Sequence, residues 1–323
     1  MQLDTSTTLT LNSQPISVQG TGGFDTVNAT AANIVAGVSL KGGNLGSTLN
    51  INGGGVVNFG ALSGLSYFSA INLDEGGVPS ETVTLRTGMN TQVNVVQTSG
   101  AGAITINGVA GDTSRIALST GIDTVNLGSA SESVIGGGGT AIINATAATA
   151  GAQIQAAGGT TTLSLSGGGA VSLNQSDSGI TEVDLKASAG AWGFTPGGVA
   201  GLTIKDLSAT ADTITGSANG TIYAGSGGNT ITGANGDAIY AGAGADTFAF
   251  HAGFGNQTIN GFAATGAGHD TLQFDKSLFA DWAHLLGATT QQGSDTIITL
   301  DANDSITLKN VTASSLQGDV KFV

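Results

Sequence analysis

Short runs of alternating apolar and polar residues recur along nearly the whole chain, and they constrain its fold more than any other feature. They come roughly every 8 to 14 residues, separated by Gly, Ser, Thr and Asn. Clear examples are residues 48–52, 70–73, 82–85, 103–106, 124–127 and 161–165. A period of two with many β-branched residues predicts strands, and this spacing leaves no room for long helices.

Two internal repeats indicate how the strands are arranged. Residues 48–59 (TLNINGGGVVNF) match residues 162–173 (TLSLSGGGAVSL), and residues 136–144 match residues 166–174 at an offset of 30. Thirty residues hold three short strands and three turns, which is one coil of a three-sided parallel β-helix. Because fixed periods are typical of solenoids, we expect an all-β, right-handed parallel β-helix or β-roll solenoid. An antiparallel sandwich or barrel is the alternative, but it calls for Asn-Gly or Asp-Gly hairpin turns at many junctions.

Composition narrows the classes of partner. Charged residues make up 9% of the chain, the net charge is −14, and no basic cluster exists. Nucleic acid and acidic membrane surfaces are therefore improbable partners. The chain has no Cys, which removes disulfides and thiolate metal sites. No apolar run approaches the roughly 20 residues of a membrane helix, and the first ten residues lack the pattern of a Sec signal peptide.

The sequence pattern changes near residue 209, where the repeat becomes shorter. Large apolar residues now fall 8 or 9 positions apart, at Ile214, Ile222, Ile231, Ile239 and Phe248. Beyond Gly253 the spacing loosens again. Residues 277–286 have the apolar face of a short helix, with Gly287 as its stop. Because a solenoid needs an atypical end to cover its last coil, we expect residues 251–323 to form a small C-terminal cap with one short helix.

The tightened region resembles the nonapeptide repeat of RTX proteins, G-G-x-G-x-D-x-U-x. The best copies are residues 241–249 (AGAGADTFA) and 232–240 (TGANGDAIY), while residues 224–232 have Asn229 in place of the motif Asp. In that family the repeats form a parallel β-roll that holds Ca²⁺, a cation that prefers oxygen ligands. The resemblance implies that Asp237 and Asp246 bind Ca²⁺, with Asp212 nearby. Weaker ligands would be Asn229 and the backbone carbonyls of Gly225, Gly227, Gly233, Gly242 and Gly244.

The C-terminal stretch is also similar to the tails of proteobacterial RTX proteins, in residues 246–250, 254–262, 268–275 and 294–311. In that family the uncleaved C-terminus is read by a type I secretion machine. The first 200 residues resemble S-layer and adhesin coils in texture only. The expected organisation is a parallel β-helix over 1–208, an RTX-like β-roll over 209–250, and a cap with the secretion signal over 251–323.

Several other residues could be read as metal ligands but have simpler structural interpretations. Asp25 and Asp123 share a Gly-x-Asp-Thr-Val-Asn phrase and are expected to cap turns before strands rather than to bind a cation. His251, His269 and His284 have spacings that fit no zinc motif. Ten Asn residues are expected to stack into ladders at the coil corners: Asn28, Asn50, Asn52, Asn58, Asn72, Asn94, Asn107, Asn126, Asn144 and Asn174.

A parallel β-helix also invites comparison with polysaccharide-cleaving enzymes. Carboxylates are available for a hydrolase pair at Asp74, Glu75, Glu81, Glu182 and Asp184. The cations Lys41, Arg86, Arg115, Lys186 and Lys205 are too sparse for a lyase cleft. Trp192 and Phe194 could form a sugar-stacking platform, although a loop plug is the simpler interpretation.

The sequence therefore predicts a secreted, non-enzymatic protein at the cell surface or outside the cell. It is expected to self-assemble as a homo-oligomer or polymer in a surface layer, matrix or filament, with Ca²⁺ involved. An adhesin or module that binds cell-surface glycan is the alternative, and a carbohydrate-active enzyme is the third hypothesis.

Overall fold

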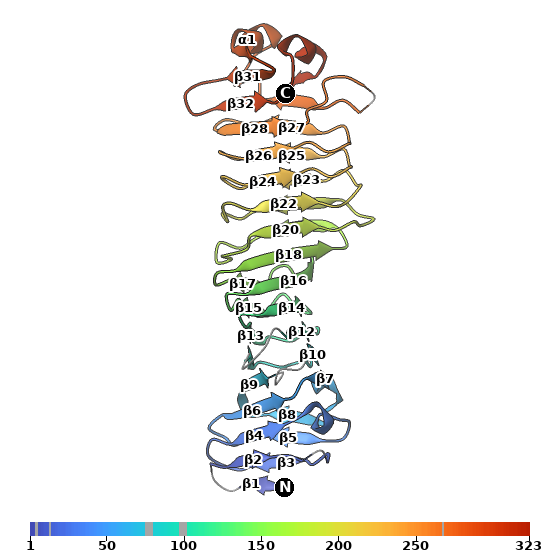
Figure 1. The fold of residues 1–323 in the computed structure, drawn as a ribbon, viewed down its shortest axis with the longest axis vertical. Helices are drawn as coiled ribbons and strands as arrows, with labels where there is room; N and C mark the ends of the chain where they lie inside the picture. Colours follow the sequence, from blue (N-terminus) through green and yellow to red (C-terminus); the bar gives the residue numbers. More distant parts are fainter. Residues whose placement is uncertain (4–5, 13, 75–79, 97–101, 267) are drawn as a thin grey trace. The chain divides into compact units, whose positions relative to one another are not determined.

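The computed structural model describes residues 1–323 except 4–5, 13, 75–79, 97–101 and 267. The regular secondary structure of the described residues is almost entirely strands, and most of these pair in parallel into long sheets as the chain coils from one sheet to the next (Figure 1). The predicted β-solenoid is confirmed.

The chain divides into two compact units. The first comprises residues 1–163 and 176–180, and the second comprises residues 164–175 and 181–323. The strand β18 (Thr160–Ser166) runs across the boundary. The separation of a β-helix from a β-roll at residue 208 stays a prediction.

The first unit contains strands of three sheets. One sheet has the order β1 (Gln2–Leu3), β3 (Val18–Gly20), β5 (Ser39–Lys41) and β8 (Gly64–Ser66). The second contains β2 (Thr8–Thr10), β4 (Thr26–Ala29), β6 (Ser47–Asn52), β9 (Phe68–Asp74), β11 (Gln92–Val95), β13 (Arg115–Ala117), β15 (Ser133–Ile135) and β17 (Gln153–Gln155). The third contains β7 (Gly55–Asn58), β10 (Ser80–Thr84), β12 (Ala103–Asn107), β14 (Ile122–Asn126) and β16 (Thr140–Thr146). Short 3-10 turns lie at η1 (Ala31–Asn33) and η2 (Phe59–Ala61).

The second unit is built from two sheets. One has the order β19 (Gly169–Ser172), β21 (Trp192–Thr195), β23 (Thr213–Thr215), β25 (Thr230–Thr232), β27 (Thr247–Phe250), β29 (Thr271–Phe274) and β33 (Val320–Phe322). The other contains β20 (Glu182–Leu185), β22 (Thr203–Asp206), β24 (Thr221–Tyr223), β26 (Ala238–Tyr240), β28 (Asn256–Asn260), β32 (Ser305–Leu308), β31 (Asp295–Thr299) and β30 (Thr289–Gln292).

The coil is shorter than the repeat suggested. Hydrogen-bonded equivalents lie 22 residues apart at Asn50 and Asn72, 18 apart at Asn126 and Asn144, and 17 apart in the second unit. The predicted coil length of thirty residues is therefore wrong, although the predicted three strands per coil occur at β5, β6 and β7. From β9 onward each coil of the first unit has two strands, one in each of two sheets. The two segments matched at an offset of 30 have different backbone conformations. Only Gly138 among residues 136–139 has positive φ, whereas Gly167, Gly168 and Gly169 all do.

The longer repeat does correspond to a repeated structure. The triple glycines at 53–55 and 167–169 join β6 to β7 and β18 to β19, and all six have φ between 66° and 117°. Three successive residues in this region require glycine, because a Cβ makes the conformation strained. Each triple glycine is followed by a strand, β7 or β19, that lies at the edge of its sheet.

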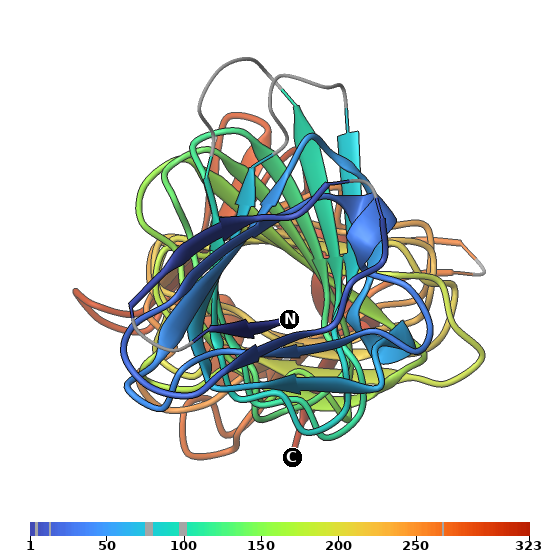
Figure 2. The same cartoon turned by 90° about the horizontal axis from the view of Figure 1, so that it is seen from below.

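The interior is filled by columns of aliphatic side chains. In the first unit Val27, Leu49, Ile71, Val93 and Ile116 stack in register and are completely buried. Figure 2 is a view down the axis about which the chain coils, and it shows the N-terminal strands surrounding this interior. Each such side chain stabilises the fold by about 1.5–3 kcal/mol through burial of apolar surface. In the second unit all five apolar residues of the 8–9 residue period are buried.

The asparagine ladders lie on the strands. Asn28, Asn50, Asn72 and Asn94 are linked by side-chain amide bonds of 2.7–2.9 Å, each Nδ2 donating to the Oδ1 one coil earlier. Asn107, Asn126 and Asn144 form a second ladder. Their expected place at coil corners is wrong for these members, because an amide can meet its equivalent only where the backbone repeats in register.

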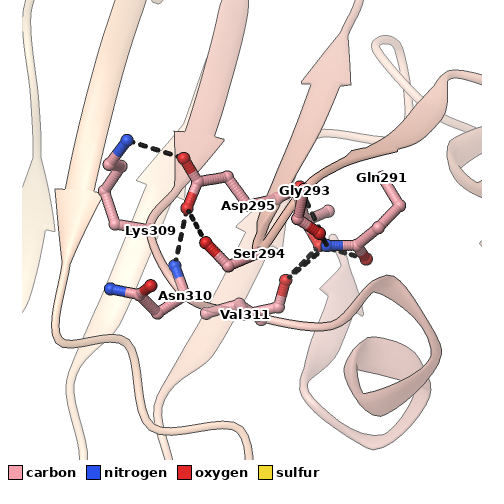
Figure 3. Close-up of polar contacts among 8 residues, drawn as sticks. Gln291, Gly293, Ser294, Asp295, Lys309, Asn310 and Val311 are labelled. Atoms are coloured by element: carbon pink, nitrogen blue, oxygen red, sulfur yellow. Dashed lines mark hydrogen bonds and ion pairs between the residues drawn. The ribbon is translucent and has the colours of Figure 1, made fainter.

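The C-terminal end departs from the coil. Beyond β28 the sheet continues through β32 to the antiparallel strands β31 and β30, beside α1 (Trp282–Gly287) and η3 (Ala313–Gly318). Asp295, at the start of β31, accepts bonds from Lys309 and from the backbone N–H of Asn310, which directly follow β32, as Figure 3 shows. This arrangement ends the stack of coils in that sheet, which is the role predicted for a cap.

The helix is shorter than predicted. It begins after Asp281, whose carboxylate accepts the backbone N–H of His284, and Gly287 is its last residue rather than its stop. An N-cap of this kind fixes where a helix can start. Leu285 is buried on its inner face, but Leu286 is exposed, so the predicted apolar face is only partly used.

Candidate functional site

The predicted calcium ligands lie at two different corners of the second unit. Asp212, Asn229 and Asp246 each come directly before a strand of one sheet, β23, β25 and β27. Asp237 comes before β26, a strand of the other sheet. The expectation that Asp237 joins Asp212 and Asp246 is therefore wrong, because the 8–9 residue period alternates between the two sheets.

The first corner is held by a ladder of side-chain to backbone bonds. The N–H of each member donates to the Oδ1 of the equivalent residue one coil later. The bonds run from Asp212 to Asn229, from Asn229 to Asp246 and from Asp246 to Asp270, at 2.8–2.9 Å. The N–H of Trp192 extends the ladder by donating to Asp212. All these side chains are buried.

The sequence interpretation missed Asp270 and Asp206. Asp270 continues the ladder in a longer coil, and the phrase Asp-Thr followed by a large apolar residue, shared with Asp246, could have revealed it. Asp206 accepts a bond from the side-chain amide of Asn229 at 3.0 Å. No repeat position marks Asp206, since it lies at the end of a strand.

Both carboxylate oxygens of the two principal predicted ligands have protein donors. In Asp246, Oδ1 accepts the N–H of Asn229 and Oδ2 accepts the N–H of Gly242. In Asp237, the donors are the N–H groups of Gly220 and Ala234, both at 2.8 Å. These carboxylates therefore satisfy backbone groups that would otherwise be buried and unpaired.

The predicted glycines allow successive turns to approach closely. A Cβ on Gly242 would lie 1.6 Å from the carbonyl oxygen of Gly225, and one on Gly244 would lie 1.9 Å from that of Gly227. At Gly233 a Cβ would meet the side-chain oxygen of Gln257 at 2.2 Å. The carbonyls of Gly225 and Gly227 thus face the next turn of the backbone.

Burial changes how the carboxyl groups of this region titrate. It raises the pKa of Asp237 and Asp246 above the ordinary value. Burial raises the pKa of Asp270 to about 6, and the charge of Asp246 adds to this. Burial also raises the pKa of Asp206 to about 6, with the charge of Asp212 contributing. A raised pKa is the expected result of removing a carboxylate from water.

These side chains, as they lie, do not fit a calcium ion. Ca²⁺ takes six to eight oxygen ligands, whereas each oxygen of Asp237 and Asp246 already accepts a backbone bond. Among the residues that the structure describes, no three His, Cys, Asp or Glu side chains gather closely enough to hold a metal ion. Calcium binding stays a prediction.

The remaining candidates are separate from one another. His251, His269 and His284 each contact a different aspartate, Asp275, Asp319 and Asp281, at 2.7–3.0 Å, and form no cluster. Asp25 accepts the N–H of Thr7, and Asp123 accepts both the N–H and the hydroxyl of Ser119. Both carboxylates are buried. The bonds of Asp123 to Ser119 fit the turn-capping interpretation, whereas Asp25 bonds to Thr7, a residue 18 positions earlier in the chain, rather than to its own turn.

The groups considered for carbohydrate chemistry are dispersed or buried. Glu182 pairs with Lys205, and Asp184 pairs with Lys186. Glu75 lies outside the described residues. Trp192 and Phe194 lie on β21 and are at most 2% exposed, so they form neither a sugar platform nor a loop plug. Side chains alternate between the two faces of a strand, and Trp192 and Phe194 both lie on the inner face of β21.

The outer side of β7, β10, β12, β14 and β16 forms an uncharged surface of the first unit. Three columns of outward residues run across these strands in register. They are Ser80, Ala103, Ile122 and Thr140; Val56, Thr82, Thr105, Thr124 and Ile142; and Asn58, Thr84, Asn107, Asn126 and Asn144. We call these residues the outer face. None is charged, and Val56 and Ile122 are 75% and 54% exposed.

Comparison with protein-family models and with curated proteins finds no match to this chain. No helix among the described residues has the length and apolar character needed to cross a membrane.

Proposed function

We propose that this protein is an extracellular structural protein whose copies associate side by side, through the outer face, into a surface layer or matrix. The single observation that carries the proposal is the in-register, uncharged surface of β7, β10, β12, β14 and β16. The proposal includes no catalytic step.

Charge determines where two copies can meet. At a net charge of −14 they repel each other wherever carboxylates face one another. The outer face lacks this repulsion, and its Thr and Asn side chains carry both donors and acceptors. Burying Val56 and Ile122 against a second copy would remove apolar surface from water. A second copy of this chain is thus the occupant that the face fits.

The size of the face indicates a weak, repeated contact. Five strands about 4.8 Å apart, each contributing about five residues of about 3.3 Å, cover about 400 Å². A stable isolated dimer buries about 800 Å² on each partner. Contacts of this size are stable when many copies of the protein associate at once, as in a layer.

Stacking of coils end to end has less support. In the second unit the sheet of β28 ends in the antiparallel pair β30 and β31, and the other sheet ends in a parallel strand of only 3 residues, β33. Lateral association therefore fits this chain better than a filament of stacked coils.

Export by a type I secretion machine is part of the same proposal. Its support is the resemblance of the tail to RTX proteins, in residues such as 268–275 and 294–311. Calcium is left out of the assembly step, because the carboxylates of Asp237 and Asp246 are already bonded to backbone N–H groups.

The proposal is tested by placing one charge at the centre of the outer face. Thr105 lies in the middle column on the middle strand, between Thr82 and Thr124. In Thr105→Glu, two meeting copies would each bury a new carboxylate, so we expect association to weaken at least tenfold in sedimentation velocity. Ser131→Glu is the control, since it adds the same charge at an exposed turn. Equal association of both variants and the parent would contradict the proposal.

A further inference from the structure

A cavity of about 320 Å³ lies in the first unit where one of its sheets ends. Strand β8 is the last strand of the sheet β1-β3-β5-β8, so it pairs with β5 on one side only. The next coil passes this position as the turn at residues 86–91 rather than as a strand. The hollow between β8 and this turn is lined by Ser66, Tyr67, Arg86, Thr87, Asn90 and Thr91 among others.

Arg86 lines the cavity and brings a positive charge to it. Its Nη1 is buried and has no hydrogen-bond partner among the described residues, and no described carboxylate forms an ion pair with it. A buried guanidinium nitrogen without a partner is unfavourable. In a chain with only two arginines and a net charge of −14, an arginine that lines a cavity without a described carboxylate partner marks a place for an anion.

Tyr67 adds an exposed aromatic ring beside this charge. Its φ of 61° lies in the left-handed region, and the other non-glycine residues found there in the described part of the chain are both asparagine. A bulky residue in this conformation stores strain, which is typical of binding sites. The ring is 53% exposed, and the ammonium of Lys41 lies 5.3 Å from its centre.

From these features we propose that the cavity binds a single acidic sugar ring, a uronate, as found in acidic polysaccharides. The guanidinium of Arg86 matches a carboxylate in shape and charge. Asn90, Thr87 and Thr91 offer amide and hydroxyl groups to the sugar hydroxyls, and the ring of Tyr67 offers an apolar surface. A volume of about 320 Å³ is at the small end of ligand pockets, which suits one ring. This binding goes beyond the proposed assembly and does not depend on it.

The test is calorimetric titration of the full chain with D-glucuronate, D-glucose and acetate. We expect glucuronate to bind at least tenfold more tightly than either of the others. Arg86→Gln should weaken glucuronate binding about tenfold or more, the loss expected for a charge-assisted bond. Arg115→Gln, which removes the other arginine, should bind like the parent. Tyr67→Asn keeps a residue that tolerates the left-handed region and should weaken binding several-fold.

Each contrary outcome has a definite meaning. Equal binding of glucose would overturn the role of the carboxylate, and equal binding of acetate would overturn the assignment to a sugar. No detectable binding of glucuronate would overturn the site. Thermal melting gives a second readout, because Arg86→Gln removes a charge that no described carboxylate pairs with, and it should not lower the melting temperature without ligand. A lower melting temperature would show that Arg86 is structural. Thr105→Glu should bind glucuronate like the parent, which separates this site from the assembly face.

Discussion

Asp246→Ala, which removes the carboxylate, should destabilise one corner of the second unit. The matched control is Asp246→Asn. Asp246 is fully buried, and it accepts the N–H groups of Asn229 at 2.8 Å and Gly242 at 3.2 Å. Asp246→Ala leaves both groups buried without an acceptor. Asp246→Asn keeps an oxygen for Asn229, and Asn229 itself holds the equivalent place one coil earlier, where its Oδ1 accepts the N–H of Asp212.

The difference between the two variants follows from counting unpaired groups. Each buried N–H left without an acceptor costs about 1–3 kcal/mol. Asp246→Ala should therefore lower the free energy of unfolding of this region by about 2–6 kcal/mol. Both variants remove the charge, but Asp246→Asn loses one acceptor at most, so it should be more stable than the alanine variant by at least about 1 kcal/mol.

Native-state hydrogen exchange measures this region directly, because solenoid coils need not unfold together. In Asp246→Ala the amide of Asn229 should lose protection, while in Asp246→Asn it should keep most of it. Both measurements are made with chelator and again with millimolar Ca²⁺. If the parent loses the same protection in chelator alone, the ladder depends on calcium and the reasoning from backbone bonds is refuted.

Three further changes follow from the same contacts. Burial, with the charge of Asp112 adding to it, raises the pKa of Glu132 from the ordinary 4.5 to about 7; this group therefore removes stability as the pH rises from about 4.5 to about 7. Glu132→Gln should melt above the parent at pH 8 and equally at pH 4, and the same difference at both pH values would contradict this. Gly242→Ala should disrupt the second unit in circular dichroism melts, whereas Gly287→Ala, with open space around it, should not. Asn72→Ala breaks the ladder on both sides and should cost about 1–2 kcal/mol in urea unfolding, against little for Asn52→Ala.

The strands and the inward positions could be predicted from the sequence because they depend on a local period. Ile214, Ile231 and Phe248 alternate with polar residues, and burial of an apolar side chain fixes which way each strand faces. The coil length could not be read from the offset of 30, since the chain varies its corners while keeping strands in register. Its true value is set by contacts such as that of Asn50 with Asn72.

The candidate sites were harder to predict for a physical reason. The motif aspartates were identified, yet a motif does not state whether a carboxylate accepts an N–H or a cation. Asp206 and Asp270 join the ladder from outside the period. The cavity beside Arg86 has no sequence signal, because it arises where the sheet of β8 ends, and that depends on how one coil passes the next.

Electron microscopy of the concentrated protein in chelator tests the central claim most directly. The proposal predicts ordered side-by-side arrays in which the outer face, centred on Thr105, lies at the contact between copies, and it predicts that Thr105→Glu forms none. Particles that stay single at every concentration, or arrays in which β10, β12 and β14 face solvent, would contradict it.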